Sequence, residues 1–449
     1  MKNTSETRDK LKKIIYKFFK KEIYQNIRDS RKRKTIHAIE LSELKKSKFL
    51  KLINHAKIYS PYYRTLLMNN NVNSIDDLIN LPILTKTIIK KNIDYIKSTS
   101  EEDLKYIKKN STSGSTGKAS NFYSDKRDKR EARVIRGDEF VPNFNFFDKQ
   151  LIFWGAERDV ISKKSLSYYF NKLIVKKQIV STYHLTEQDI NRNVDLINKF
   201  KPVTIVGYPS ALHFMALQIQ KNDNVKLSSY PEGIISAGET LQLHQKDIIE
   251  DVFKTRVYNR YGCREVGHIA NECIEHNGYH YNADDLIIEV VDDKGDLCKD
   301  GIVGNLLITD LNNYAFPMIR YNIGDLGSIS NLKNCSCGCT LPKLKTIEGR
   351  TFEIIHGTNG NKVSGTFWTL TFRNTVNGVE AFQIKQASNH NLHINVKTNE
   401  SFSFKEEEKI KQIIREKLGE GIEIEIHKVG EFEYTKTGKF KWITSELSN

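Results

Sequence analysis

The sequence predicts an α/β protein whose core is a mainly parallel sheet covered by helices. Short apolar runs that end in glycine lie at residues 151–155, 203–207 and 233–238, and segments with helical spacing lie at 209–220 and 241–253. Strands buried on both faces of a parallel sheet have this continuous apolar character, and the helices between them form the crossover connections. We therefore expect strands and helices to alternate in the middle of the chain.

The regions on either side of this core have different patterns. Residues 1–100 are mainly helical; Ser74 and the acidic residues after it are typical of a helix start, and Pro82 ends that helix. Residues 286–291 and 304–309 are apolar runs bounded by turn residues. These runs predict a strand-rich part after the parallel strands.

A small α+β domain is expected at the C-terminal end. Residues 382–396 alternate like strands, residues 404–418 have helical spacing, and residues 422–426 alternate strictly. The expected organisation is a helical N-terminal region (1–100), a core that forms one large domain with it (101–349), and a small C-terminal domain (350–449).

Length and composition restrict the class of protein. The 449 residues allow two or three domains at roughly 150 residues each. Hydrophobic residues make up 39% of the chain and charged residues 28%, which is typical of a soluble globular protein and excludes a disulfide scaffold or a disordered chain. The sequence has no run of about 18 apolar residues and no signal peptide, so we expect a cytoplasmic enzyme.

The chain is basic, with 70 Lys and Arg against 55 Asp and Glu and a formal net charge of +15. This charge favours anionic partners, but it is spread along the chain, and abundant Lys, Asn and Ile are also typical of an AT-rich genome. We expect no specific nucleic-acid partner, because no basic patch is interleaved with aromatic residues.

One basic segment stands apart at residues 1–34, where apolar residues recur at helical spacing among lysines and arginines. Two interpretations stay open for it. A helix packed on the main body with a solvated basic face is favoured, and a peripheral contact with an anionic membrane is the alternative.

The sharpest motif is a run of small and hydroxyl residues that ends in a lysine. It consists of Ser111, Thr112, Ser113, Gly114, Ser115, Thr116, Gly117 and Lys118. Glycines allow the backbone to approach a ligand closely, and hydroxyls beside a lysine suit phosphate. The spacing differs from that of a Walker A loop, so a P-loop NTPase is disfavoured.

Further motifs follow this loop in the order, and at about the spacing, found in the adenylate-forming superfamily. The runs YGCRE at 261–265, YNIGD at 321–325, GR at 349–350 and TKTGK at 435–439 resemble motifs of that family. Residues 81–86, 207–210, 236–240 and 337–342 look like the phenylacetate–CoA ligase branch, including its CapK-like members of capsule biosynthesis. The resemblance extends over roughly residues 75–445.

This resemblance implies an adenylate-forming fold with a small mobile C-terminal domain, and activation of a carboxylate by ATP as acyl-AMP. The phosphate loop would hold the β- and γ-phosphates, Glu265 would bind Mg²⁺ with Thr116 near it, and Lys439 would bridge the carboxylate and the α-phosphate. A lysine suits this position because its compact ammonium group can enter with a mobile domain and neutralise both anions.

The resemblance also implies a nucleotide pocket. Its residues would be Ser236, Ala237, Gly238, Glu239, Tyr261, Gly262, Arg264, Asp325 and Arg350. Within this set Asp325 would accept hydrogen bonds from the ribose, with Arg350 assisting, and Tyr261 would stack on adenine. Candidate walls of the acyl pocket are Phe153, Trp154, His184 and Tyr208, although aromatic residues in such strands are more often plain core.

The sequence departs from the family pattern at three positions. Arg264 replaces the threonine before the glutamate, Ala119 replaces the proline after the phosphate loop, and Phe352 replaces the usual acidic hinge residue. Arg264 has two interpretations, a bidentate contact with the α-phosphate or an outward position without a role. Phe352 puts in doubt a domain rotation like that of thioester-forming relatives.

Cysteine and histidine residues suggest a structural metal. Cys273, His280, Cys335 and Cys337 offer three thiolates and an imidazole, which suit tetrahedral Zn²⁺. Cys339 follows in the same run and would be a bystander. Reduced free thiols in a cytosolic protein are the alternative interpretation.

The leading functional hypothesis is an acyl-CoA synthetase-like ligase that uses ATP and Mg²⁺, with coenzyme A as the acyl acceptor. A second hypothesis keeps the adenylation but transfers the acyl or aminoacyl group to an amine or hydroxyl of a sugar or polysaccharide precursor. A third is a nucleotide-binding scaffold without catalysis, and Lys439 argues against it.

Overall fold

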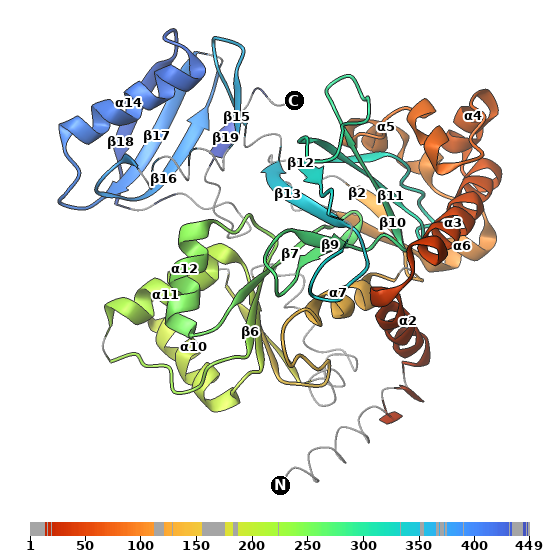
Figure 1. Ribbon diagram of the computed structural model, residues 1–449, viewed down its shortest axis with the longest axis horizontal. Coiled ribbons are helices and arrows are strands. Elements are labelled where there is room, and N and C mark those ends of the chain that lie inside the picture. Colours follow the sequence, from red (N-terminus) through yellow and green to blue (C-terminus); the bar gives the residue numbers. More distant parts are fainter. Residues whose placement is uncertain are drawn as a thin grey trace. The chain divides into compact units, whose positions relative to one another are not determined.

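The computed structural model of the chain (Figure 1) divides into two compact units. The large unit consists of Met1–Ile323 and Gly327–Thr346. The C-terminal unit consists of Gly324–Leu326 and Ile347–Asn449. Each unit has its own hydrophobic core. The structure describes residues 14–15, 17–18, 20–111, 121–127, 129–154, 176–182, 187–222, 224–332, 334–350, 354–364, 368, 372, 375–388, 390–430, 432, 443–445 and 447.

The N-terminal region is helical in its described part. Its elements are α2 (Lys21–Lys32), the 3-10 helix η1 (Arg33–Thr35), α3 (Ala38–Tyr59), α4 (Pro61–Asn69), the 3-10 helix η2 (Ile75–Asn80), α5 (Lys86–Ile96) and α6 (Glu101–Tyr106). Ser74 and Asp77 form a capping box at the start of η2, in which each side chain accepts a backbone N–H that the helix end leaves free.

The parallel part of the large sheet lies where the apolar runs predict it. Its strands are β3 (Gln150–Trp154), β4 (Lys177–Ser181), β5 (Thr204–Gly207), β6 (Gly233–Ala237) and β7 (Val257–Cys263). They follow the spatial order β4-β3-β5-β6-β7, and all neighbouring pairs are parallel. Every residue of β5 and β6 is buried, which explains their continuous apolar character.

Helices cover one face of these parallel strands. The helices α10 (Glu187–Phe200), α11 (Pro209–Lys221) and α12 (Leu243–Phe253) share a core with them, in which Ile197, Leu212 and Phe253 are fully buried. On the opposite face Val141 packs with residues of β5, β6 and β7.

The strand-rich stretch continues the same sheet. Its strands are β8 (Gly267–Glu272), β9 (Tyr279–Tyr281), β10 (Leu286–Val291), β11 (Gly304–Asp310), β12 (Tyr321–Ile329) and β13 (Lys343–Arg350). The described strands join in the order β10-β11-β12-β13-β9-β8-β7-β6-β5-β3-β4. The pairs β7–β8, β8–β9, β9–β13 and β10–β11 are antiparallel, so the sheet is mixed.

A separate hairpin precedes the large sheet. Strands β1 (Ile107–Ser111) and β2 (Asn121–Asp125) pair antiparallel, with Ser111 opposite Asn121. Both ends of the segment that contains the predicted phosphate loop are therefore fixed to one hairpin. Helix α7 (Arg130–Asp138) follows and lies against the sheet near β8, because the backbone of Gly137 approaches the Asn271 side chain closely.

The described part of the C-terminal unit contains a four-stranded sheet and the helix α14. Its described elements are β14 (Ile354–His356), β15 (Lys362–Ser364), β16 (Val379–Gln386), β17 (Asn391–Thr398), α14 (Phe404–Leu418), β18 (Glu423–Lys428) and β19 (Ile443–Ser445). The sheet order is β18-β17-β16-β19, and β14 pairs with β15 separately. Ile410 and Ile414 of α14 are fully buried in one core with Ile384 and Ile394 of the sheet.

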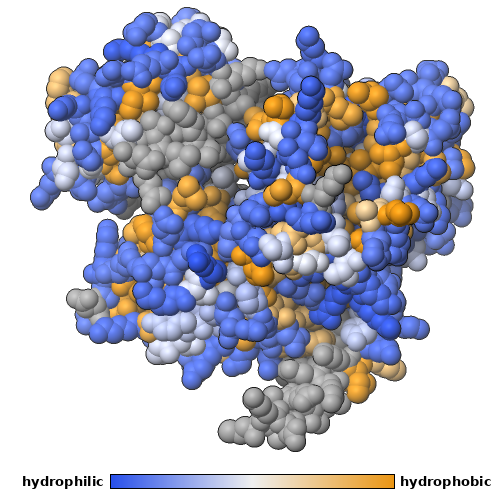
Figure 2. All heavy atoms as spheres, viewed as in Figure 1, coloured by the Kyte–Doolittle hydropathy of each residue, from blue (hydrophilic) through white to orange (hydrophobic). Residues whose placement is uncertain are grey.

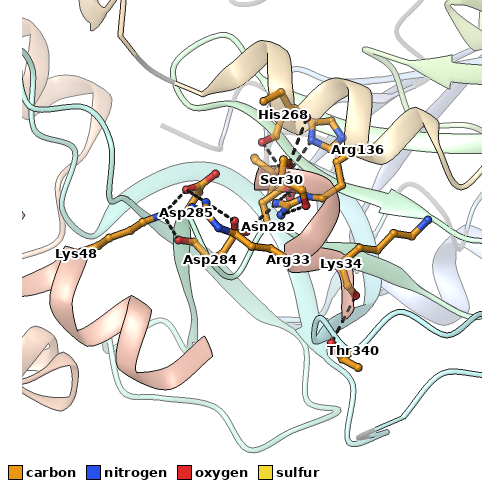
Figure 3. A network of polar contacts seen from close by, with 12 residues as sticks. Ser30, Arg33, Lys34, Lys48, Arg136, His268, Asn282, Asp284, Asp285 and Thr340 are labelled. Atoms are coloured by element: carbon orange, nitrogen blue, oxygen red, sulfur yellow. Dashed lines mark hydrogen bonds and ion pairs between the residues drawn. The ribbon is translucent and has the colours of Figure 1, made fainter. Parts of the chain in front are cut away.

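The N-terminal helix α2 packs on the main body in its described part, which is the favoured interpretation of the basic segment. Ile27 lies in a small core with Ala132 and Ile135 of α7. Figure 3 shows the polar contacts beside it: Arg136 donates to the backbone oxygen of Ser30 (3.3 Å) and forms an ion pair with Asp284 (2.7 Å).

The same network extends to η1 and α3. Arg33 forms an ion pair of 3.2 Å with Asp284, and Lys48 forms one of 2.6 Å with Asp285 (Figure 3). Burial alone would raise the pKa of Asp285, but the charges of Lys48, Arg133 and Arg136 lower this pKa below its usual value. The basic residues of this region are thus used partly for internal ion pairs.

Hydrophobic residues on the face shown in Figure 2 gather more over α3, α4 and α5 than over α10, α11 and α12. Ile58 of α3, Met68 of α4 and Tyr95 of α5 are exposed, with 56%, 69% and 63% of their surface accessible. Among the described residues, every helix is too short or too polar to cross a lipid bilayer.

Candidate active site and metal cluster

Two groups of the predicted nucleotide residues, 236–239 and 261–264, lie near the carboxyl ends of two adjacent parallel strands. Strands β6 and β7 are parallel, and Ala237 pairs with Arg260 in their register. Gly238 comes directly after the end of β6, and Tyr261 follows Arg260 on β7. In open α/β sheets ligands bind outside the carboxyl ends of parallel strands, so the arrangement suits a ligand site.

An aromatic pair lies against the end of β6. The rings of Trp154 and Tyr208 stack with centroids 4.5 Å apart, and a Cβ atom added to Gly238 would lie 2.8 Å from the Tyr208 ring. Gly238 also has a φ of +83°, which side-chain-bearing residues rarely adopt. Glycine is therefore required here for two independent reasons. Phe153, in contrast, is buried in the core of the sheet.

Two polar side chains, Ser236 and Glu239, lie close to Gly238 in the sequence. Ser236 is fully buried, and its hydroxyl has no hydrogen-bond partner in the part of the chain that the structure describes. Glu239 accepts a hydrogen bond of 3.1 Å from the backbone N–H of Ser210, close to the start of α11. A buried hydroxyl without a protein partner is costly unless a ligand or a water satisfies it.

Glu265 lies in the turn between β7 and β8, and only 7% of its surface is exposed. Its Oε1 accepts a hydrogen bond of 3.0 Å from the hydroxyl of Tyr321, the first residue of β12. Its other oxygen, Oε2, receives no hydrogen bond from the described residues. The YGCRE and YNIGD motifs are thus in direct contact, and one carboxylate oxygen is left for a cation.

Two arginines of α7 hold this turn in place. Arg130 donates to the backbone oxygens of Arg264 (2.9 Å) and Glu265 (2.6 Å), and Arg133 donates to that of Val266 (2.8 Å). The sequence interpretation missed both arginines. The sequence of a short polar helix predicts that its arginines are exposed to solvent. In the structure Arg133 is fully buried, which the sequence does not indicate.

The remaining described site residues differ in exposure. Arg264 and Gly262 are exposed and Tyr261 is partly buried, whereas Asp325 is buried on β12 four residues after Tyr321. Both interpretations of Arg264 therefore stay predictions.

Several predicted residues lie outside the described part of the chain. They are Thr112, Ser113, Gly114, Ser115, Thr116, Gly117, Lys118, Ala119, His184, Phe352 and Lys439. Ser111 ends β1 and Arg350 ends β13, but their side chains are not described. The roles of all these residues remain predictions.

The structure brings the four predicted metal ligands together. The ligand atoms of Cys273, His280, Cys335 and Cys337 all lie within 4.8 Å of one another. The sulfurs of Cys273 and Cys335 are 3.7 Å apart, and Cys337 Sγ lies 3.3 Å from His280 Nε2. Ligand atoms around tetrahedral Zn²⁺ are about 3.5–3.8 Å apart at ordinary Zn–S and Zn–N distances, so the cluster fits this metal.

The surroundings of His280 also suit a ligand. Its Nδ1 lies 2.7 Å from the backbone oxygen of Leu341 and donates to it, which leaves the Nε2 lone pair directed at the cluster. Burial lowers the pKa of His280 to about 4, so the ring is neutral near pH 7. Cys339 is not part of the cluster; its backbone N–H donates to the Cys337 sulfur.

Sequence comparison connects this arrangement to known proteins. Residues 355–446 match the CapK C-terminal domain family. The chain is 26% identical over 362 residues to Protein CapK of Staphylococcus aureus, an alignment that covers 79% of this chain and 77% of that protein. It is also 26% identical over 345 residues to the phenylacetate-coenzyme A ligase of Thermus thermophilus, with 72% and 74% covered.

By these comparisons the chain is CapK-like and phenylacetate–CoA ligase-like, and residues 355–446 carry the CapK C-terminal domain. It is an adenylate-forming, CoA ligase-like enzyme. Solved structures of the superfamily share its fold. A 2-hydroxyisobutyryl-CoA ligase in the postadenylation state, in complex with R3-HIB-AMP, matches with a TM-score of 0.72 at 17% identity, over 92% of this chain and 91% of that one.

An anthranilate CoA ligase, AuaEII, in complex with anthranoyl-AMP matches this CapK-like chain less completely. The TM-score is 0.53 at 16% identity, over 74% of this chain and 65% of that one. At these identities the likeness concerns the fold, and the predicted α/β adenylate-forming architecture with a small C-terminal domain is confirmed.

Proposed function

We propose that the chain activates a carboxylic acid with ATP as acyl-AMP, releases pyrophosphate, and transfers the acyl group to coenzyme A. The observation that carries this proposal is the contact between Glu265 and Tyr321, which joins two motifs of the family beside the end of β6. The reaction is an attack of a carboxylate on the α-phosphate, so catalysis depends on positioning and charge neutralisation.

Each residue has a role that suits this chemistry. Glu265 binds Mg²⁺ through the oxygen that Tyr321 leaves without a donor, with Thr116 nearby. The loop from Ser111 to Lys118 holds the β- and γ-phosphates. The segment of Ser236, Ala237, Gly238 and Glu239 lines the adenine and acyl pockets, together with Tyr261, Gly262 and Arg264.

The remaining roles concern the ribose and the reacting groups. Asp325 accepts hydrogen bonds from the ribose hydroxyls, with Arg350 beside it. Lys439 neutralises the carboxylate and the α-phosphate during attack. Trp154 and Tyr208, which stack against Gly238, are the best candidates for a wall of the pocket.

Coenzyme A is the preferred acceptor because two similar proteins are named as CoA ligases. A second candidate is transfer to an amine or hydroxyl of a sugar or polysaccharide precursor. It is favoured by the match of residues 355–446 to the CapK C-terminal domain, and by Phe352 at the usual position of the hinge.

Exchange of labelled pyrophosphate into ATP tests adenylation before the acceptor is known, because acyl-AMP formation is reversible. A panel of aryl, fatty, amino and hydroxy acids should contain at least one that supports exchange. If the protein binds ATP and no acid supports exchange, the chain is a nucleotide-binding scaffold.

The acceptor is tested with preformed acyl-AMP. Coenzyme A should release AMP rapidly and give a thioester that mass spectrometry detects. A wide preference for an amine or a sugar hydroxyl over coenzyme A would establish the second candidate.

We also propose that Cys273, His280, Cys335 and Cys337 bind one structural Zn²⁺. A site with three thiolates and one imidazole is closed, so the ion takes no part in the chemistry. It would tie the segment after Glu265 to the loop after β12, and thereby stabilise the turn that carries the Mg²⁺ ligand.

A further inference from the structure

The sheet of the C-terminal unit has a polar face as well as an apolar one. Leu392 and Ile394 of β17 are buried in the core with α14, so His393 between them points to the opposite face. On the neighbouring parallel strand β18, Glu425 pairs directly with His393, and His427 follows two residues later on the same face. Two imidazoles and one carboxylate therefore meet on rigid strands.

Distances within this group fit a metal site. His393 Nδ1 lies 2.9 Å from Glu425 Oε2, His427 Nε2 lies 3.4 Å from the same oxygen, and all three ligand atoms lie within 4.8 Å of one another. Nitrogen and oxygen ligands at about 2.0–2.2 Å from an ion are separated by about 3.0 Å in octahedral and about 3.4 Å in tetrahedral geometry. The separations of 2.9 Å and 3.4 Å match these values.

The orientation and exposure of the side chains support the same conclusion. The rings of His393 and His427 are nearly parallel, with an interplanar angle of 17° and centroids 6.2 Å apart, and Glu425 interacts with both. The three side chains are 38%, 61% and 54% exposed in the order His393, Glu425, His427. Exposed ion pairs of this kind contribute little to the stability of the fold. Because the three side chains are exposed, a metal ion in solution can reach them directly.

We propose that His393, Glu425 and His427 form a binding site for a divalent transition-metal ion such as Ni²⁺ or Zn²⁺. Imidazole and carboxylate ligands select such ions over Mg²⁺ and Ca²⁺, which prefer oxygen alone. The site differs from the cysteine cluster in having no thiolate and in keeping coordination positions open to solvent. A bound ion would join the edge strand β18 to β17 and so stabilise the sheet edge.

Calorimetric titration of the full chain with Ni²⁺ tests the proposal. The protein is first incubated with Zn²⁺ and desalted, so that the cysteine cluster does not contribute. Wild type should bind one Ni²⁺ that the variant His393→Ala binds at least about tenfold more weakly, and His427→Ala should show the same loss. His390→Ala is the matched control, because His390 is an exposed histidine of the same unit outside the group, and it should bind like wild type.

A further readout separates a metal site from a folding effect. Ni²⁺ should raise the melting temperature of wild type and of His390→Ala but not of His393→Ala. Equal Ni²⁺ stoichiometry and affinity in wild type and both histidine variants would overturn the proposal. The double variant Cys335→Ser, Cys337→Ser should still bind one Ni²⁺ per chain. This result would establish that the Ni²⁺ site lies outside the cysteine cluster.

Discussion

The hydroxyl of Tyr321 donates a hydrogen bond of 3.0 Å to the carboxylate of Glu265, although the two residues are 56 positions apart in the sequence. Glu265 lies in a turn that is fixed from the other side by Arg130 through two backbone oxygens. The proposed Mg²⁺ ligand is thus held by contacts from α7 and from β12. Such support matters because catalytic groups must be held close to the productive geometry.

Tyr321→Phe should lower the rate of pyrophosphate exchange about tenfold, because it removes one hydrogen bond to a charged group, worth about 1.5 kcal/mol or more. The ring stays, so the buried core around it is unchanged. The Mg²⁺ concentration needed for half-maximal activity should rise as well.

Glu265→Gln is the companion variant for this test. It should lose more activity than Tyr321→Phe, since it removes the charge that attracts Mg²⁺. Full activity of Tyr321→Phe at every Mg²⁺ concentration would show that this hydrogen bond has no role in metal binding.

Gly238→Ala should reduce adenylation by about tenfold or more, because the new Cβ would lie 2.8 Å from the Tyr208 ring and the φ of +83° strains any L-residue. Gly360→Ala is the matched control. Gly360 has a similar φ of +82°, but nothing lies within 4 Å of an added Cβ. The control carries the same backbone strain without the steric contact.

Steady-state exchange assays, in which the concentrations of ATP and of the acid are varied separately, show whether Gly238→Ala weakens binding of ATP or of the acid. The Michaelis constant for the substrate whose pocket contains the Trp154–Tyr208 pair should rise. If Gly238→Ala and Gly360→Ala have equal activity, the aromatic pair does not line a substrate pocket.

Local patterns explain the parts of the fold that the sequence predicts well. The helical spacing of residues 404–418 predicts α14 with both of its bounds, and the buried run before Gly238 predicts β6. The four metal ligands are predicted because thiols and imidazoles are few: the chain has six cysteines and twelve histidines. In each case the prediction depends only on the types of residue and on their spacing along the chain.

Contacts between distant segments explain what the sequence did not predict. Strand β1 reads IKKNS, a polar run without alternation, and it is a strand because it pairs with β2. The contacts of Arg130 with residues 264 and 265, and of Tyr321 with Glu265, depend on how the sheet places α7 and β12. The spacing of apolar residues indicates local secondary structure, so it does not predict contacts between distant segments.

Cys335→Ser, Cys337→Ser should lose one equivalent of zinc per chain and lower the melting temperature, because binding through deprotonated ligands contributes several kcal/mol to folding. Elemental analysis of protein purified without added metal measures the zinc. Cys298→Ser is the control, since Cys298 is a free cysteine outside the cluster. A chelator should lower the melting temperature of wild type before it changes the rate of adenylation. Wild-type protein that is free of metal and equally stable would leave the cysteines as ordinary thiols.

Lys439→Ala should lower adenylation by two to four orders of magnitude, on the order of 3–5 kcal/mol, with little change in ATP affinity. The reason is that the lysine acts on charge that develops during attack. Lys436→Ala, in the same TKTGK motif, is the control and should retain activity. Exchange kinetics and equilibrium ATP binding are measured in parallel. An equal loss of ATP binding in Lys439→Ala would mean that the lysine contacts ATP in the ground state.

The stability of the large unit should fall below neutral pH because of His213 on α11. Burial, and secondarily the charge of His244, lowers the pKa of His213 to about 4 from an ordinary value of 6.5. Between these two pH values the unfolded chain binds a proton that the folded chain does not, so the free energy of unfolding decreases as the pH falls. For a single group with these pKa values the loss is about 2 kcal/mol at about pH 5.

His213→Leu removes the titrating group while keeping an apolar side chain of similar size beside His244, with which the imidazole makes an edge contact at 5.4 Å. The Nε2 of His213 has no hydrogen-bond partner among the described residues, so the substitution breaks no side-chain hydrogen bond of that atom. Urea unfolding of wild type, His213→Leu and the exposed-histidine control His390→Ala, each near neutral pH and at about pH 5, measures the effect. The difference between the two pH values should shrink by about 2 kcal/mol in His213→Leu alone. An unchanged difference would mean that His213 takes up its proton in the folded state as readily as in the unfolded one, and that the acid sensitivity comes from other groups.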